Sequence, residues 1–438
     1  MDVTSKKIDA NPTKEFFISM LTRDIDIKAA ILELIDNSID GAKRIRRDGN
    51  YIGLEVRITL NKDEFVIKDN CGGISIDTAQ QRAFRFGRPD KASDDGLFTG
   101  VFGIGMKRSL FRMGKYFSIE SKTETEEFTL EVDVDEWVKE KSENWTFEFD
   151  TMERNANNEI TKCGTIIKVT RLHTGISNNF ALEYFTKTLI SHIEKYRTTA
   201  AENGLEIYVN NQKIIFLKEE LIDSKSIKPF AKNESIGNVS IKVIAGVAPK
   251  GTPEKAGWYI YCNGRLIIYA DKTVLTGWGE DGAPIFHPKF ATFRGFVFFE
   301  SLHLEELPWN TTKTGIDTSS QYYISAKQLM KNALSQVNAM KNAIDKVEEE
   351  KRPMAEKELF SNKDSIELTT NTLAELFSRS SEFIYTLPDS AKLVSMSSIS
   401  YQVKTSEMEE VKKSLGATSN KEVGLKTFQY YRSRECEE

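Results

Sequence analysis

The N-terminal part of the chain places its predicted helices and strands in blocks, and this order limits the possible folds most. Apolar residues recur every three or four positions over 14–48, which predicts helical structure. Strand-like runs follow at 54–60 and 64–69, and a Gly-rich, charged stretch at 86–105 precedes another helical pattern. A further strand-like run at 164–170 closes the block. Because a doubly wound parallel sheet requires strict alternation, this order predicts an α+β fold built on an α/β sandwich.

The length of the chain predicts more than one domain. Its 438 residues, 39% of them hydrophobic, exceed what one compact core normally absorbs. We expect the sandwich over residues 1–198 and a second α/β domain over 199–352 that ends in a long helix. Residues 353–438 are expected to form a helical connector and a short C-terminal module.

Composition restricts the cellular setting and the partners. The formal net charge of −5 provides no global basic field, so nucleic-acid binding would need a local basic face. The four cysteines are far apart and form no CxxC pair, which argues against a disulfide framework or a zinc site. There is no signal-like apolar run at the N-terminus and no stretch of about 18 apolar residues. We expect a cytoplasmic protein with no membrane partner.

The segment ELIDNSIDGA at 33–42 contains the first candidate site. On a helix, Glu33, Asn37 and Asp40 are spaced to share one face. The Asn37 amide oxygen suits a hard cation such as Mg²⁺, and the Glu33 carboxylate one turn away can orient or deprotonate an attacking water. Alone, an acidic helix face is more often solvated surface.

The segment IKDNCGGIS at 67–75 contains the second candidate site. Asp69 ends a strand-like run, and its carboxylate can accept a hydrogen bond from an adenine amino group. Gly73 has no side chain, so the backbone there can approach a base closely. The alternative interpretation is an ordinary β-turn.

The third candidate site is the Gly-rich stretch that leads into a helix. Gly100, Gly103 and Gly105 precede that helix, so backbone N–H groups at its start can bind phosphates. Lys107 and Lys91 would add positive charge. A glycine-rich loop by itself is weak evidence for such a site.

Together and in this order, the three segments resemble the motifs of the GHKL ATPases, which are gyrase, the ninety-kilodalton heat-shock chaperone, histidine kinases and the mismatch-repair ATPase. The family motifs read approximately ExxDNxxDA, DxGxG and FGxxxK…GxxGxGxK, and the match covers residues 33–107. The Gly-Thr pair at 164–165 fits a fourth motif. The resemblance implies a Bergerat ATP-binding fold that uses ATP and Mg²⁺.

The resemblance also assigns roles to individual residues. It implies that Glu33 activates the hydrolytic water and that Asn37 binds magnesium. It implies that Asp69 binds adenine with support from the Thr165 hydroxyl through water. Asp40 and Gly73 are expected to be further nucleotide-site residues, and the phosphate lid is expected to comprise Gly100, Gly103, Ile104, Gly105, Met106 and Lys107. One departure is Cys71, which replaces the first glycine of DxGxG, so Gly72 is expected to shift the turn.

Two further comparisons distinguish branches of the family. A histidine kinase needs a phospho-accepting histidine before its ATP domain, and no histidine precedes His173. In gyrase, mismatch-repair and microrchidia (MORC) ATPases, a second domain brings a lysine to the γ-phosphate. The corresponding candidate is Lys313 in LPWNTTKTGID, with a solvated surface lysine as the alternative.

The C-terminal module resembles the ribbon-helix-helix family. Apolar and polar residues alternate over 399–404, which predicts a strand, and two amphipathic helices follow. The resemblance implies that the outward strand face, which carries Ser400, Gln402 and Lys404, contacts DNA. Dimerisation or packing alone remains an equally open role for the module.

The layout is most similar to that of MORC-like and mismatch-repair ATPases. It predicts an ATP-hydrolysing clamp that forms a homodimer on binding ATP and acts on DNA in prokaryotic genome maintenance or antiviral defence. No nuclease motif is recognisable, so DNA cleavage would need a separate effector or nuclease protein. A protein-remodelling chaperone and a non-catalytic ATP sensor remain alternatives.

Overall fold

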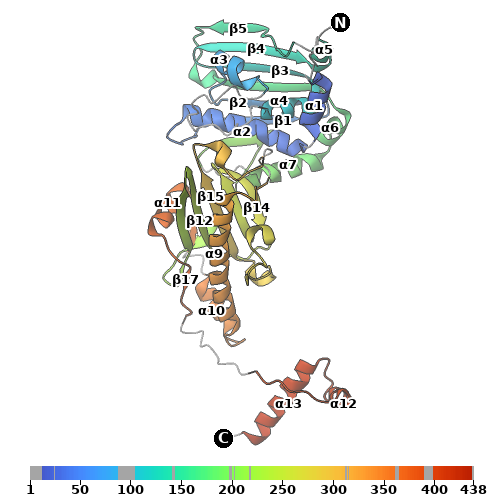
Figure 1. Cartoon of the computed structure of the whole chain (residues 1–438), viewed down its shortest axis with the longest axis vertical. Helices are drawn as coiled ribbons and strands as arrows, with labels where there is room; N and C mark the ends of the chain where they lie inside the picture. Colours follow the sequence, from blue (N-terminus) through green and yellow to red (C-terminus); the bar gives the residue numbers. More distant parts are fainter. Residues whose placement is uncertain are drawn as a thin grey trace, which may run out of the picture.

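The structure is a computed structural model. It describes residues 12–436 except 24, 87–103, 141–143, 197–199, 202, 217–218, 311–312, 314, 361–364 and 389–397. Two large sheets with their helices follow one another along the long axis of the molecule (Figure 1). This architecture confirms the predicted α+β class with an α/β sandwich in the N-terminal part.

The first sheet has eight strands in the order β5-β4-β3-β6-β2-β1-β7-β8. All of its neighbouring pairs are antiparallel except β1 and β7. The sheet includes β7 and β8, so the domain boundary expected after residue 198 comes before its last two strands. The apolar side chains of Ile207, Val209 and Ile214 explain this extension, because they lie in the core of the first sheet. The strands are β1 Glu55–Leu60, β2 Glu64–Asp69, β3 Gly114–Lys122, β4 Glu126–Asp133, β5 Thr151–Arg154, β6 Gly164–Leu172, β7 Glu206–Val209 and β8 Gln212–Lys213.

Two helices form where one continuous pattern was predicted over 14–48. The second, α2 (Ile27–Ile45), begins after Asp26, whose carboxylate accepts a hydrogen bond from the Lys28 N–H at 2.9 Å. This cap satisfies an N–H group at the helix start and so favours a new helix there. Most of α2 is buried. The other helices described in this part are α1 Lys14–Arg23, α3 Ile76–Thr78 with the following π-helix Ala79–Ala83, α4 Gly105–Met113, α5 Val134–Lys139, the 3-10 helix Ile160–Lys162, α6 Thr174–Phe180 and α7 Glu183–Tyr196.

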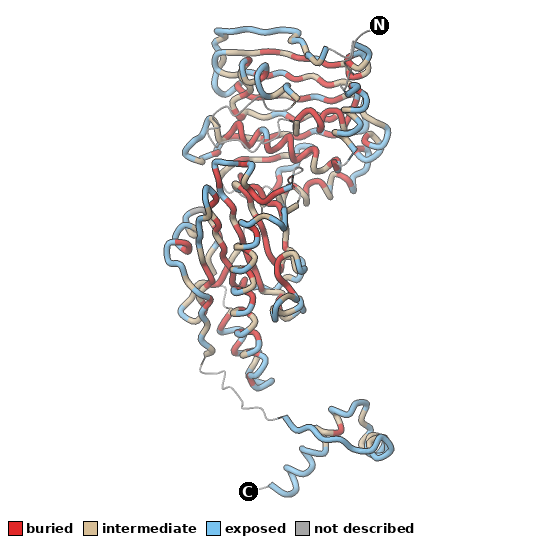
Figure 2. The backbone as a smooth tube through the Cα atoms, in the orientation of Figure 1, coloured by how far each residue is buried: buried red, intermediate tan, exposed pale blue. Residues whose placement is uncertain are grey.

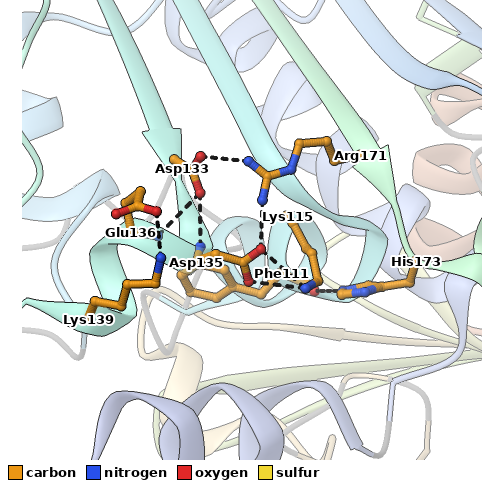
Figure 3. Close-up of polar contacts among 8 residues, drawn as sticks. All are labelled: Phe111, Lys115, Asp133, Asp135, Glu136, Lys139, Arg171 and His173. Carbon is orange, nitrogen blue, oxygen red and sulfur yellow. Dashed lines mark hydrogen bonds and ion pairs between the residues drawn. The ribbon is translucent and has the colours of Figure 1, made fainter.

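A cluster of charged side chains joins one end of the first sheet to α5. Arg171 donates to Asp133 and to Asp135, both at 2.6 Å, and Lys115 also contacts Asp135 (Figure 3). Asp133 caps α5. His173 lies 3.0 Å from the Phe111 carbonyl oxygen, which connects β6 to α4. These contacts connect the ends of β3, β4 and β6 to α5 and α4, and they stabilise the fold of this part of the chain.

The second sheet has five strands in the order β11-β12-β15-β13-β14. The long helix α9 (Gln321–Asp345) packs on it and buries Met330, Leu334 and Val337, so the core lies between this helix and the sheet (Figure 2). The helix ends at Asp345, seven residues before the expected end of the domain at 352. The strands are β11 Phe230–Ile236, β12 Val239–Val247, β13 Gly257–Cys262, β14 Arg265–Asp271 and β15 Phe293–Glu300.

Part of the expected C-terminal region belongs to the second sheet domain. Two short strands, β16 (Ser365–Glu367) and β17 (Ile384–Tyr385), pair with β9 (Glu220–Ile222) and β10 (Ile227–Lys228). The apolar side chains of Leu359, Leu376 and Phe377 are buried against the second-domain clusters. These side chains lie in α10 (Arg352–Leu359) and α11 (Thr370–Arg379), so the region expected to start at 353 is only partly separate.

The last helices are α12 (Thr405–Leu415) and α13 (Asn420–Glu435), which contact each other. Residues 399–403 form no strand in this single chain, although the alternation predicted one. An isolated strand has no neighbour to accept its backbone hydrogen bonds, which explains the difference. Among the described residues, none of the helices combines the length and the hydrophobicity that a membrane crossing requires.

We predict that Gly295→Ala destabilises the second domain. Gly295 lies on β15, and a Cβ atom there would lie 2.3 Å from Cε3 of the buried Trp258 ring. Overpacking of this kind typically costs about 1–3 kcal/mol of unfolding free energy. Urea denaturation of the full chain would measure the loss. Gly175→Ala is the control, because a Cβ atom there meets nothing within 4 Å, and an equal loss in both variants would contradict the packing argument.

Candidate functional site

The acidic face predicted on α2 is present, and its members differ in exposure. Glu33, Asp36 and Asp40 are buried, with exposed fractions of 8%, 7% and 7%. Asn37 is exposed. The face therefore presents one accessible amide next to a group of buried carboxylates.

Asp69 is the point where the predicted segments converge. Its Oδ2 accepts a hydrogen bond from the Ser38 hydroxyl of α2 at 2.8 Å. Its Oδ1 accepts from the Cys71 N–H at 2.9 Å and from the Thr165 N–H at 3.3 Å. Thr165 thus supports Asp69 through its backbone, whereas the predicted contact was through its hydroxyl and a water. Ser38 was not predicted, although its place next to Asn37 in the same segment was a usable signal.

The environment of Asp69 affects its charge. Burial of the carboxyl group raises its pKa, and the hydrogen bonds from Cys71, Ser38 and Thr165 and the positive charge of Arg44 oppose that rise. A carboxylate stays ionised in such a place only where donors stabilise it. On balance the pKa of Asp69 stays above its ordinary value, and the three donors hold the carboxyl group as a preorganised hydrogen-bond acceptor at the end of β2.

The turn after Asp69 accommodates Cys71 by using the next two glycines. Gly72 and Gly73 both have positive φ values, 86° and 66°. A Cβ atom on Gly73 would lie 2.1 Å from the Lys122 carbonyl oxygen, so the backbone of β3 already requires glycine there. Cys71 is buried, and burial raises the pKa of its thiol. The role of Gly73 towards a base remains a prediction.

The start of α4 lies directly against Glu33. Gly105 is the first residue of α4, and a Cβ atom there would lie 2.2 Å from Oε2 of Glu33. The first and third predicted segments therefore meet in space. Ile104 precedes the helix and Met106 is buried in the core. Lys91, Gly100 and Gly103 lie outside the described residues.

Lys107 makes a contact that the sequence did not indicate. Its side chain is 1% exposed, and its Nζ donates to the Ala83 carbonyl oxygen at 2.8 Å. Burial lowers the pKa of this amine to about 7. Lys107 thus connects α4 to the segment after α3, and a contact with phosphate remains a prediction.

The second domain contributes two cations to the acidic face of α2. Arg265, at the start of β14, donates from Nη1 to Glu33 Oε1 at 3.1 Å and to Asp36 Oδ2. Lys313 is 6% exposed; burial lowers its pKa, and the charge of Glu33 raises it, so the two groups interact. The Lys313 Nζ lies 5.2 Å from the centroid of the Trp309 ring, and its role at a γ-phosphate remains a prediction. Arg265 was not predicted, because an Asn-Gly turn indicates a hairpin but not what the hairpin touches.

These residues fit a nucleotide with its metal. The Asp69 carboxylate offers an acceptor, the Asn37 amide is exposed beside Glu33, and the N–H groups at the start of α4 are suited to anions. Among the described residues, no group of three or more His, Cys, Asp and Glu side chains could hold a metal ion. A metal here would therefore share its coordination with phosphate oxygens, as magnesium commonly does.

The comparisons with known proteins agree with this geometry. Residues 25–165 match the family described as Histidine kinase-, DNA gyrase B-, and HSP90-like ATPase. No curated protein matches the chain. The matched segment includes Glu33, Asn37, Asp69, Gly105 and Thr165. Residues 25–165 are therefore similar to the ATP-binding domains of the GHKL superfamily.

Proposed function

We propose that this protein is an ATP-hydrolysing clamp that dimerises on binding ATP and acts on DNA. The observation that supports it most is the contact of Arg265 with Glu33, and Lys313 of the same domain is buried and feels the charge of Glu33. Two domains thus contribute side chains to one site. A bound nucleotide can then influence the position of the second domain, which is the requirement for a clamp.

The chemistry around Asp69 favours adenine. An ionised carboxylate only accepts hydrogen bonds, and the adenine amino group donates one. Guanine presents a carbonyl oxygen at the equivalent position and would be repelled. The Ser38, Cys71 and Thr165 contacts hold the carboxylate in a fixed orientation, so its acceptor is directed before the base arrives.

Glu33 is our candidate general base for hydrolysis. Its Oε2 lies beside the start of α4, where the phosphates would bind. Water would form a bond to the γ-phosphorus, the bond from that phosphorus to the bridging oxygen would break, and Glu33 would take the proton of the water. Asn37 would hold Mg²⁺, which neutralises charge on the phosphates. Lys313 would stabilise the charge that develops on the transferred phosphoryl group.

The DNA-related part of the proposal rests on the resemblance in layout to MORC-like and mismatch-repair ATPases. The C-terminal helices α12 and α13 are compatible with a ribbon-helix-helix-like module. A strand over 399–403 would then form only when two chains pair. Cleavage of DNA would be the task of a separate effector or nuclease protein.

ATP turnover with and without duplex DNA tests the proposed function. We expect DNA to stimulate turnover in a salt-dependent manner, since phosphate contacts weaken as salt rises. With a non-hydrolysable ATP analogue, we expect a mass of twice the 49.8 kDa of one chain. Stimulation by unfolded protein clients instead of DNA would favour a chaperone. Binding and dimerisation without turnover would favour an ATP sensor.

Asp69→Asn should weaken ATP binding by about 10- to 100-fold. The substitution removes a charge-assisted hydrogen bond and presents an amide donor near the adenine amino group. Calorimetric titration measures the affinity, and thermal unfolding shows whether the fold survives the change. Asp63→Asn is the control, because Asp63 is exposed on the turn before β2. Unchanged ATP affinity in Asp69→Asn would remove Asp69 from the nucleotide site.

Lys313→Ala should slow ATP hydrolysis and weaken ATP-driven dimerisation, while ADP binding stays normal. ADP lacks the phosphate that Lys313 would contact, so only the ATP-dependent steps should change. Steady-state turnover, calorimetry with ADP and mass measurement test the three parts. Lys346→Ala, in the turn after α9, provides a lysine control outside the site. Wild-type turnover and dimerisation in Lys313→Ala would contradict the role.

A further inference from the structure

We propose that Arg265 is a positioning residue for Glu33, so that hydrolysis depends on contact between the second domain and α2. Arg265 would hold one oxygen of the carboxylate and leave the other facing the phosphate-binding start of α4. The inference rests on the proposed function of Glu33 as the base. It adds a structural reason why the isolated ATPase domain would be a poor catalyst.

The two oxygens of Glu33 have different surroundings. Oε1 accepts from Arg265 Nη1 at 3.1 Å and lies 3.7 Å from Arg108 Nη2. Oε2 lies on the side of Gly105, the first residue of α4. Cations therefore hold one oxygen, and the second is directed towards the position where phosphates and the attacking water would bind.

Arg265 is held rigidly by its own domain. It follows the two-residue turn Asn263–Gly264, in which both residues have positive φ values of 46° and 79°. The Asn263 side chain donates to the Ser301 carbonyl oxygen at 2.8 Å and accepts from the Ser301 N–H at 3.0 Å. The hairpin tip is thus anchored to the end of β15. Any shift of the second sheet relative to α2 would move the guanidinium.

The guanidinium is also held from the side of α2. It donates to Asp36 as well as to Glu33, which lie one turn apart on the helix. Burial lowers the pKa of Arg265, but the charges of Asp36 and Glu33 outweigh burial and raise it overall. The arginine therefore remains charged, and Asp36 fixes the group that in turn positions Glu33.

A buried ion pair by itself is weak evidence for a catalytic role, so a matched control is needed. The same sheet provides one in Arg294 on β15, which is 2% exposed and pairs with Glu219 at 3.3 Å. Arg294 contacts no carboxylate of α2 in the described structure. Removing either arginine should reduce the stability of the protein. Only removal of Arg265 should change the position of the Glu33 carboxylate, the proposed general base.

The test compares Arg265→Ala, Arg265→Lys and Arg294→Ala in the full chain. For Arg265→Ala we expect kcat to fall at least tenfold while ATP affinity stays within about threefold, because misplacing a reacting group lowers the rate more than binding. Arg265→Lys should recover part of kcat, since a lysine retains the positive charge but can keep only one of the contacts with Glu33 and Asp36. Arg294→Ala should lower the unfolding temperature with kcat nearly unchanged.

If Arg265→Ala fails to fold, Asp36→Asn provides a second test. The substitution weakens the contact that Asp36 makes with the Arg265 guanidinium, so it should also lower kcat.

Wild-type kcat in a folded Arg265→Ala protein would overturn the proposal, and so would an equal loss of kcat in Arg294→Ala. Glu33→Ala, assayed in parallel, separates this inference from the proposed function. Normal turnover in Glu33→Ala would show that Glu33 is not the base. If Glu33→Ala loses turnover while Arg265→Ala retains it, Glu33 remains the candidate base and only the positioning role of Arg265 is contradicted.

Discussion

The buried carboxylates of α2 are the constraint on which the arrangement of the two domains depends. Glu33, Asp36 and Asp40 lie on one face of a helix that is otherwise packed into the first core. Burying like charges together is unfavourable unless cations compensate them. The first domain provides Arg108, and the second provides Arg265 and a nearby Lys313. The contact between α2 and the start of β14 therefore neutralises charge.

Close backbone approaches explain why the glycines of the candidate site are needed. A Cβ atom on Gly164 would lie 2.0 Å from the Asp69 carbonyl oxygen, and one on Gly41 would lie 2.6 Å from that of Cys71. These glycines allow β6 and α2 to approach the strand end that holds Asp69. The same packing accepts Cys71 where the family motif has glycine, because its side chain enters the core and Gly72 and Gly73 form the turn.

Local sequence patterns predicted strands that match β1, β2 and β6, since alternation and helical periodicity act over a few residues. Elements that depend on distant partners were predicted less well. The pairing of β7 with β1 placed residues 206–209 in the first sheet, although they follow the expected boundary. The alternation at 399–403 predicted a strand that has no neighbour in one chain. The break before α2 was missed because the Asp26 cap competes with continued periodicity.

The sequence by itself determined the order of the three segments, the α+β class and the acidic face of α2, because spacing along a helix sets which residues share a face. It also identified Asp69, Gly105 and Lys313 as candidates. Only the tertiary structure decided that Ser38 holds Asp69, that Lys107 donates to Ala83 and that Arg265 meets Glu33. Arg265 and Glu33 are separated by 232 positions, and their contact depends on how the second domain packs against α2, which no local pattern encodes.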